Sequence, residues 1–415
     1  MTKPRLLFYF ACPLDQVTGA QFRLCGAIGL LQDSCDITLL VPGTPDWDDT
    51  NRKFGSQVKK EGIRVVPYKR PGGRWTKFRI WFACYGPLDP AVGKMAAQYD
   101  LCVSFDNFGY FGTPGIHIAT NLSLLYSMGI RIPKYKMWRD PDTPLSSLVI
   151  TGIKRGFVRS AHAVLTLFKI VMRRKKRFLK ICGRNGDRIV ANSNWLASFL
   201  KAEGYRPDIL YPPVVAKFRH IPLEKRRNDF VCIGRIHEQK RLVTMIEILE
   251  KVRGITGIPF RFRIVAPLND DPYCRYICKL AQSRPWIKLE GELYGAEKEE
   301  VLTSCKYAIH ACLVETFGIS VAEYLKAGCI PFVPAAAGPG EIVEIEELCF
   351  RDTEDAVKKI TGVLGKSGAE QTALQARLLE RGEAFSLDEF DNSLMSLIKE
   401  ELEKRGFAGV PGRTF

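Results

Sequence analysis

The sequence has no long uninterrupted hydrophobic run, and this absence argues against a membrane-spanning helix. Such a helix needs about 20 consecutive apolar residues, and even LSSLVITGIKRGFV, residues 145–158, is interrupted by Lys154 and Arg155. At 415 residues and 46% hydrophobic side chains, the chain is long enough to bury a large core in two or three domains. We therefore expect a folded, soluble protein.

The sequence also lacks regularly spaced cysteine pairs and a recognisable secretory leader. None of the 13 cysteines forms a CxxC pair, the spacing typical of a zinc site. Free thiols in a reducing compartment are the simplest interpretation. The first residues, MTKPRLLFYFACPLDQVTG, contain no small-residue cleavage site, so we interpret them as a first strand. These features predict a cytoplasmic location.

Positive charge is concentrated in the first half of the chain. Residues 1–217 contain 33 Lys and Arg against 15 Asp and Glu, whereas the remainder contains 28 against 30. The basic run MRRKKRF, residues 172–178, follows the apolar stretch HAVLTLFKIV. It fits either a solvated face or a helix lying on anionic lipid at the cytosolic face of a membrane. No nucleic-acid motif accompanies it, so we expect no nucleic-acid partner.

Short β-branched or aromatic runs alternate with longer segments of helical period, the pattern of parallel sheets covered by helices. Two such series occur, separated by ILYPPVVAKFRHIPLEKRRND, residues 209–229. The fold class is therefore α/β, with an N-terminal domain at residues 1–215 and a second domain at 216–385. Ligands of such sheets bind at the carboxyl ends of the strands.

The segment FVCIGRIHEQK predicts a strand, a short loop at Gly234 and two cations before the next helix. Arg235 could bind a diphosphate as a fork and Lys240 as a point charge. A Gly-Arg step after a strand is also common, and the cations could instead form surface ion pairs. This segment therefore leaves open both diphosphate binding and surface ion pairing.

The segment ETFGISVAE, residues 315–323, places one carboxylate just before a helix start and another inside the helix. The free N–H groups of residues 317–320 would favour a phosphate there. Glu315 and Glu323 could then accept hydrogen bonds from diols on either side, which suits a nucleotide sugar with its hexose at Glu315 and its ribose at Glu323. The alternative is that both acids are ordinary helix charges. Gly328 is expected to cap this helix.

Four segments carry a family resemblance. ETFGISVAEYLKAGCIPFVPAAAGPGEIV resembles the E-x7-E signature of the retaining GT-B glycosyltransferases of the family 4 type. GRIHEQK resembles the G-R-[LI]-x-x-x-K element of the same family, and ANSNWLASFL resembles the segment that ends its first domain. FSLDEFDNSLMSLIKEEL resembles the C-terminal helix of the family. The resemblance implies the GT-B fold, in which two Rossmann-like doubly wound domains face a central cleft and the C-terminal helix, residues 386–405, crosses back to pack on the first domain.

The resemblance also implies roles for individual residues. Arg235 and Lys240 would bind the donor diphosphate together with the helix start, Glu315 the donor sugar and Glu323 the ribose. His117, in GIHIAT, is expected beside the reacting centre. Only one glycine stands where relatives have two after the first strand. The residues expected to be catalytic are His117, Arg235, Lys240 and Glu315. Those expected to bind the donor are Gly19, Gly234, Arg235, Lys240, Glu315, Phe317, Gly318, Ile319 and Glu323. His162, His220, His237 and His310 are interpreted as structural.

The reaction implied is hexose transfer with retention, without a cofactor or a metal. GDP-mannose is the first donor hypothesis, because NSNW followed by YPP resembles the alpha-1,2-mannosyltransferases of lipid-linked oligosaccharides, and a UDP-hexose is the second. The acceptor would be a lipid-linked or other glycan. A metal-dependent transferase would need an Asp-x-Asp motif, and those at Asp46 and Asp140 lie in loop-like sequence. A sugar-nucleotide epimerase and an inactive sugar-nucleotide-binding protein are the remaining alternatives.

Overall fold

A computed structural model of the chain describes residues 3–10, 14, 19–54, 56–67, 90–105, 111–120 and 186–407. These residues form two compact units. The first contains the described residues up to 120, residues 186–213 and residues 387–407, and the second is Val214–Ser386. The basic run at 172–178 and Asp140 lie outside the described residues. No described helix combines the length and the apolar character needed to cross a bilayer.

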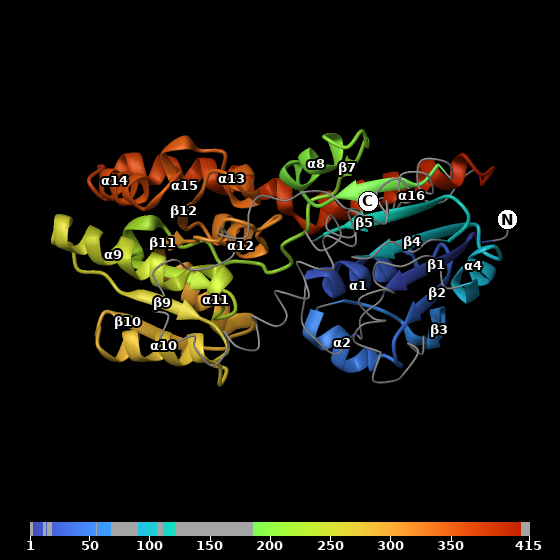
Figure 1. The fold of residues 1–415 in the computed structure, drawn as a ribbon, viewed down its shortest axis with the longest axis horizontal. Helices are drawn as coiled ribbons and strands as arrows, with labels where there is room; N and C mark the ends of the chain where they lie inside the picture. The colour runs from blue at the N-terminus through green and yellow to red at the C-terminus, as the bar shows by residue number, and fades with distance from the viewer. Residues whose placement is uncertain are drawn as a thin grey trace, which may run out of the picture. The chain divides into compact units, whose positions relative to one another are not determined.

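The first unit is built on a seven-stranded parallel sheet with the order β3-β2-β1-β4-β5-β6-β7 (Figure 1). Six strands coincide with the apolar runs of the first series, and the two-residue edge strand β7 does not. The strands are β1 (Arg5–Phe10), β2 (Asp36–Val41), β3 (Ile63–Pro67), β4 (Leu101–Phe105), β5 (Gly115–Ala119), β6 (Arg188–Ala191) and β7 (Asp208–Ile209).

Helices cover both faces of this sheet. Among the described residues, the helices of the unit are α1 (Gly19–Leu31), α2 (Trp47–Phe54), η1 (Lys60–Gly62), α4 (Pro90–Ala96), α8 (Asn194–Lys201) and α16 (Leu387–Glu403). Successive residues of β1 face opposite sides, as the two-residue period of a strand requires. Leu6 and Phe8 pack in one buried cluster with α1 and α16, whereas Leu7 packs in another with α4. The C-terminal helix therefore belongs to the first unit, as expected.

Side-chain caps set where two helices of this unit begin. The Ser193 hydroxyl accepts a hydrogen bond from the backbone N–H of Leu196 at 3.0 Å and caps α8. Asp46 accepts one from the N–H of Asp49 at 3.0 Å, just before α2. Such caps satisfy N–H groups that have no partner inside the helix. The first Asp-x-Asp match is thus part of a helix start.

The second unit contains a six-stranded parallel sheet with the order β10-β9-β8-β11-β12-β13. Its strands are β8 (Arg227–Ile233), β9 (Phe262–Val265), β10 (Ile287–Gly291), β11 (Cys305–Ile309), β12 (Ile330–Pro334) and β13 (Cys349–Phe350). The order reverses between β8 and β11, which are direct neighbours. In doubly wound sheets this switch point is where ligands bind, outside the carboxyl ends of the strands.

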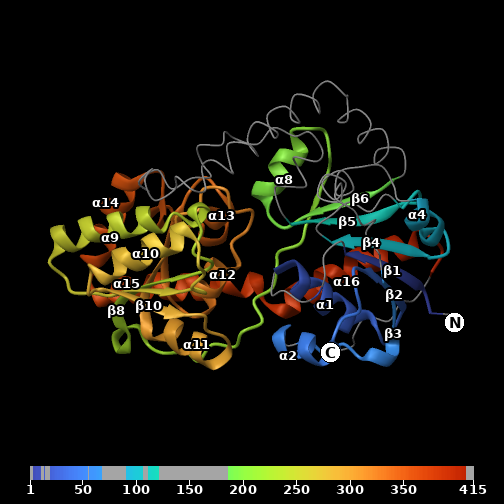
Figure 2. The same cartoon turned by 60° about the horizontal axis from the view of Figure 1, so that its bottom comes forward.

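Helices lie on both sides of the second sheet, with α9 and α10 on one side and α11 on the other (Figure 2). Helix α14 packs beside α9, and α15 packs against α12. The helices of this unit are η4 (Leu223–Lys225), η5 (Glu238–Lys240), α9 (Leu242–Thr256), α10 (Pro272–Gln282), α11 (Gly295–Ser304), α12 (Ile319–Lys326), α13 (Gly338–Val343), η6 (Glu346–Leu348), α14 (Thr353–Leu364), α15 (Gly368–Gly382) and η7 (Glu383–Phe385).

Helix α12 ends as the sequence predicted. Gly328 adopts a φ of +75°, and the N–H of the following Cys329 donates to Tyr324 O at 2.9 Å. The Arg226 guanidinium donates to Ala327 O at 2.7 Å, which satisfies another carbonyl at the same helix end. With the left-handed glycine, the Cys329 bond and a bond from the Gly328 N–H to Leu325 O at 2.9 Å form a Schellman motif. The cap therefore fixes the C-terminal end of α12.

Candidate functional site

Two loops meet at the switch point of the second sheet. One follows β8 and runs from Gly234 to Lys240, and the other follows β11 and runs from His310 to Gly318. Because β8 and β11 are hydrogen-bonded neighbours, the two loops leave the same edge of the sheet. The two sequence segments that were separately interpreted as diphosphate-binding are thereby brought together.

The first loop presents two cations in different settings. Gly234 adopts a φ of +146°, and a Cβ added there would lie 3.6 Å from Lys240 Cε. The loop then forms the short helix η5, whose last residue is Lys240. Arg235 is exposed, whereas the Lys240 side chain is only 22% exposed. Arg235 is therefore open to a ligand, and Lys240 lies deeper, against the second loop.

Tight backbone packing holds the second loop. The N–H of Gly338, at the start of α13, donates to Glu315 O at 3.0 Å. A Cβ added at Gly338 would overlap with Thr316 O, so a residue without a side chain is required there. Gly318 adopts a φ of +102°, and Phe317 is buried with its ring 5.5 Å from that of Phe385. The turn that carries Glu315 is thus fixed by neighbours on both sides.

Glu315 and Lys240 form an ion pair at the centre of the site, between Lys240 Nζ and Glu315 Oε2. Burial opposes the charge on Glu315, but Lys240, His310 and Arg235 outweigh it and lower the pKa of the carboxyl. Burial likewise opposes the charge on Lys240, and the Glu315 carboxylate outweighs it and raises the pKa of the amine. Both groups are therefore charged at neutral pH.

One carboxylate oxygen of Glu315 is available to a ligand. Lys240 Nζ and His310 Nε2 both approach Oε2, the latter at 3.8 Å. Among the described residues, no hydrogen bond or ion pair involves Oε1, and the side chain is 23% exposed. An ionised carboxylate with a free oxygen can accept hydrogen bonds from sugar hydroxyls.

Helix α12 begins beside this carboxylate. The first bonds of the helix are donated by Val321 N and Ala322 N to Gly318 O, at 2.8 and 3.3 Å. The N–H groups of Ile319 and Ser320 come before them, in the part of the helix that has no intrahelical acceptor. N–H groups at a helix start favour an anion through their dipoles. The helix start, Arg235 and Lys240 are thus the groups here suited to a phosphate.

Glu323 lies in the second turn of α12 and has a cationic partner that the sequence did not indicate. Lys298 Nζ, from α11, lies 2.7 Å from Glu323 Oε1. The Glu323 side chain is 13% exposed. The pair fixes the direction of the carboxylate, and its other oxygen has no hydrogen bond among the described residues.

His310 is a site residue that was interpreted as structural from the sequence. It directly follows β11 and is 1% exposed, and its Nδ1 and Nε2 have no hydrogen-bond partner among the described residues. Burial, with a smaller contribution from Lys240, lowers the pKa of His310 to about 3. The available signal was its position, the first residue after a buried strand and five residues before Glu315.

Two of the predicted site residues, Gly19 and His117, belong to the first unit. Gly19 is the first residue of α1. His117 lies in the middle of β5 and is 2% exposed, with Nδ1 2.7 Å from Ser104 Oγ and Nε2 3.4 Å from Asp187 Oδ1. Its ring stacks on Phe111 at 5.7 Å. These contacts are those of a core residue, and the catalytic role of His117 stays a prediction.

Residues 216–383 match the family model of the glycosyl transferases group 1. The chain is also similar to two enzymes named GDP-Man:Man(3)GlcNAc(2)-PP-Dol alpha-1,2-mannosyltransferase. The one from Eremothecium gossypii is 25% identical over 74% of this chain and 53% of that protein. The one from Candida glabrata is 22% identical over 91% of this chain and 79% of that protein. A third protein of that name, from Candida albicans, is 27% identical over 36% of this chain. The chain spans 29% of the Candida albicans protein and about half of the Eremothecium gossypii one.

Solved structures establish the fold. Anabaena HepE in complex with UDP and glucose has a TM-score of 0.62 at 13% identity, over 96% of this chain and 100% of that one. Sucrose-phosphate synthase from Thermosynechococcus elongatus has a TM-score of 0.64 at 12% identity, over 97% and 100%. WaaG, a glycosyltransferase of lipopolysaccharide biosynthesis, has a TM-score of 0.58 at 12% identity, over 95% and 99%. The fold is GT-B, as the sequence predicted.

Proposed function

We propose that the protein is a glycosyltransferase that takes a hexose from a nucleotide diphosphate sugar. One observation carries this proposal. At the switch point of the second sheet, an exposed arginine, a half-buried lysine and a helix start surround a carboxylate that keeps one oxygen free. A diphosphate bonded to a sugar matches this set, because it has negative charge for the donors and hydroxyls for the carboxylate.

The groups at the switch point would stabilise the leaving group. As the bond between the anomeric carbon and the phosphate oxygen breaks, negative charge grows on the diphosphate. Lys240, paired with Glu315, and the N–H groups of Ile319 and Ser320 are fixed before the reaction, so little reorganisation is needed when that charge appears. The exposed Arg235 adds a further positive charge. Preorganised donors of this kind lower the barrier, typically by about 10²- to 10³-fold in rate for each donor.

Glu315 would orient the hexose, and Glu323 the ribose. Because Lys240 contacts Oε2, the free Oε1 is the oxygen that would accept from sugar hydroxyls. On this account Glu315 remains ionised and hydrogen-bonded and forms no bond to the anomeric carbon. Transfer would proceed on the front face, with retention of anomeric configuration and without a metal.

GDP-mannose is the donor that we propose first, and a lipid-linked oligosaccharide the acceptor. The similarity to proteins named as GDP-mannose-dependent enzymes of PP-Dol-linked glycans supports both, over part of their length. The excess of basic residues in the first 217 positions suits an acceptor with a lipid phosphate, and a peripheral position on the cytosolic face of a membrane.

The proposal is tested by incubating the purified chain with GDP-mannose or UDP-glucose, a lipid-linked oligosaccharide acceptor and a chelator. We expect transfer from GDP-mannose, with the product carrying an α-linked mannose by NMR. Transfer from UDP-glucose but not from GDP-mannose would show that the proposed donor is wrong and that the proposed enzyme class is right. Release of free sugar without transfer would favour an epimerase or hydrolase, and binding without turnover on any acceptor would favour an inactive binding protein.

A further inference from the structure

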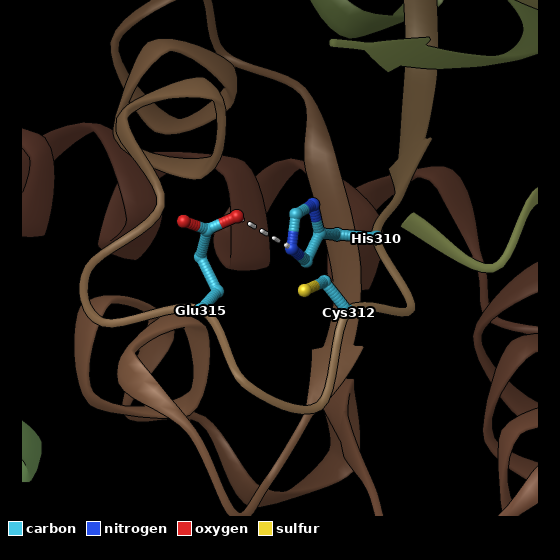
Figure 3. A group of neighbouring side chains, drawn as sticks. All are labelled: His310, Cys312 and Glu315. Carbon is cyan, nitrogen blue, oxygen red and sulfur yellow. Dashed lines mark ion pairs between the residues drawn. The ribbon is translucent and has the colours of Figure 1, made fainter. Parts of the chain in front are cut away.

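Three side chains of metal-ligating type converge at the carboxyl end of β11. His310, Cys312 and Glu315 each present one ligand atom, and these atoms lie within 4.8 Å of one another. Figure 3 shows the three side chains directed toward a common point, with His310 and Glu315 joined by the contact at 3.8 Å. His310 and Cys312 are 1% and 3% exposed, so a ligand would reach the cluster past Glu315.

His310 gives an independent reason to expect a ligand. Both its ring nitrogens are buried without a hydrogen-bond partner in the described part of the chain, which is unusual for a buried polar group. The contact with Glu315 is longer than a hydrogen bond. An imidazole can bind a metal ion through the lone pair of a ring nitrogen.

The chemistry of the three atoms selects among cations. An imidazole nitrogen, a thiol sulfur and a carboxylate oxygen together suit Zn²⁺ and similar ions, whereas Mg²⁺ and Mn²⁺ prefer sites made of oxygen. We propose that His310, Cys312 and Glu315 bind one zinc-class transition-metal ion. A water molecule would complete four-coordination.

Metal binding requires one change at each of the three ligands. Cys312 loses its thiol proton to solvent and coordinates as a thiolate, and His310 donates its lone pair. Oε2, the Glu315 oxygen nearest His310, is also the oxygen that contacts Lys240. A metal ion on Oε2 would therefore displace the Lys240 ammonium, because an ammonium and a divalent cation repel each other at such close range. The ion and Lys240 therefore compete for one carboxylate.

The ion would inhibit the proposed reaction. Glu315 and Lys240 belong to the proposed donor site, so an ion on Glu315 would compete with the nucleotide sugar. This consequence rests on the proposed function, whereas the metal site itself does not. The cluster would then serve as a point of inhibition, consistent with a reaction that uses no metal.

The test uses Co²⁺ as a spectroscopic probe on the full chain after removal of metals with a chelator. We expect one equivalent of Co²⁺ to bind with a thiolate-to-cobalt charge-transfer band, and Zn²⁺ to displace it. In Cys312→Ser the band should vanish. In both Cys312→Ser and His310→Gln the affinity should fall by about 100-fold or more, above the roughly 10- to 100-fold cost of losing a partner outside the ligand shell.

Two further variants sharpen the result. Cys329→Ser is the matched control, since Cys329 is a buried free thiol of the same unit that contacts Leu302 O, and it should bind Co²⁺ like the parent. Lys240→Met should bind Co²⁺ more tightly, because it removes the competing ammonium. Circular dichroism and thermal unfolding confirm that each variant is folded, and Cys312→Ser, a near-isosteric change, keeps the test valid if His310→Gln unfolds.

The metal site, its competition with the donor and the proposed function are each contradicted by a different result. Absence of a cobalt–thiolate band in the parent, or its persistence in Cys312→Ser, would overturn the metal site. Stabilisation by nucleotide sugar that is unchanged when Zn²⁺ fills the site would overturn the competition. Failure of the proposed function appears differently, as metal-free protein that no nucleotide sugar stabilises while the cobalt titration is intact.

Discussion

The backbone N–H of Ile233 donates a hydrogen bond to the Tyr324 hydroxyl, with 2.7 Å between nitrogen and oxygen. Ile233 is the last residue of β8, and Tyr324 lies in the middle of α12 and is buried. The bond therefore connects the strand that leads to Arg235 and Lys240 with the helix whose start is proposed to bind phosphate. It fixes the spacing between the two halves of the site.

Replacing Tyr324 with Phe tests this connection. The change leaves the Ile233 N–H without its acceptor, and a lost partner of this kind costs about 1–3 kcal/mol. We expect urea unfolding to show that loss and the KM for the donor to rise. Tyr294→Phe is the control, because Tyr294 is 57% exposed and its change should stay within about 0.5 kcal/mol. Unchanged stability in Tyr324→Phe would contradict the proposed connection.

Glu323→Gln tests the assignment of the ribose. If Glu323 accepts from ribose hydroxyls, the parent should prefer a ribonucleotide donor over its 2′,3′-dideoxy analogue. Hydrogen bonds to charged groups contribute about 1.5–3 kcal/mol, which corresponds to a preference of about 10- to 150-fold. Glu323→Gln should remove most of that preference when kcat/KM is compared for the two donors. A preference that survives in the variant would place the ribose elsewhere.

His310 should make stability depend on pH in the acid range. Its folded pKa of about 3 lies below the ordinary histidine value of 6.5, so between these values the unfolded chain binds a proton that the folded chain does not. Stability should therefore fall as pH falls from about 6.5 toward about 3, on the order of 1.4 kcal/mol per pH unit from this group.

The measurement compares the free energy of unfolding at pH 8 and pH 5 in the parent and in His310→Gln. The variant should lose on the order of 2 kcal/mol less than the parent over this interval. The exposed His220 supplies the control, and His220→Gln should follow the parent. Equal losses in the parent and in His310→Gln would mean that His310 is not held neutral.

Gly338→Ala tests the packing behind Glu315. A Cβ at this position would overlap with Thr316 O and lie 2.7 Å from Phe317 Cα, so the turn must move. We expect a loss of about 1–3 kcal/mol in stability and weaker donor binding, although residue 338 itself is not proposed to contact the donor. Gly362→Ala is the control, because it lies in α14 with nothing within 4 Å, and it should gain up to about 1 kcal/mol. A Gly338→Ala protein with parental stability and donor binding would show that the turn is not so constrained.

Much of this fold could be predicted from the sequence, because its signals are local. Buried parallel strands are short apolar runs between helical segments, and these located all the strands except the two-residue edge strands β7 and β13. The Gly328 cap was readable for the same reason, since it needs only a glycine after a helix.

The site was predictable only in part, because its electrostatics depend on contacts distant in the chain. Lys298 and Glu323 are 25 residues apart, and no local sequence pattern predicts that they form an ion pair. The first loop left open whether Lys240 forms an ion pair, and it does so with Glu315, 75 residues away. The ring nitrogens of His310 are unpaired because no described neighbour places a hydrogen-bonding group beside them. A local sequence pattern cannot predict such an absence.

Lys240, Arg235 and the start of α12 are proposed to bind the diphosphate of a nucleotide sugar. Calorimetric titration of GDP into metal-free protein tests this proposal most directly, with Lys240→Met and with Lys251→Met, which alters an exposed pair with Glu354 instead. We predict that Lys240→Met weakens GDP binding by about 10- to 150-fold, since it removes a charged hydrogen bond and leaves Glu315 unpaired, and that Lys251→Met binds GDP like the parent. Equal GDP affinity in the parent and in Lys240→Met, or no binding of GDP or UDP to the parent, would contradict the account.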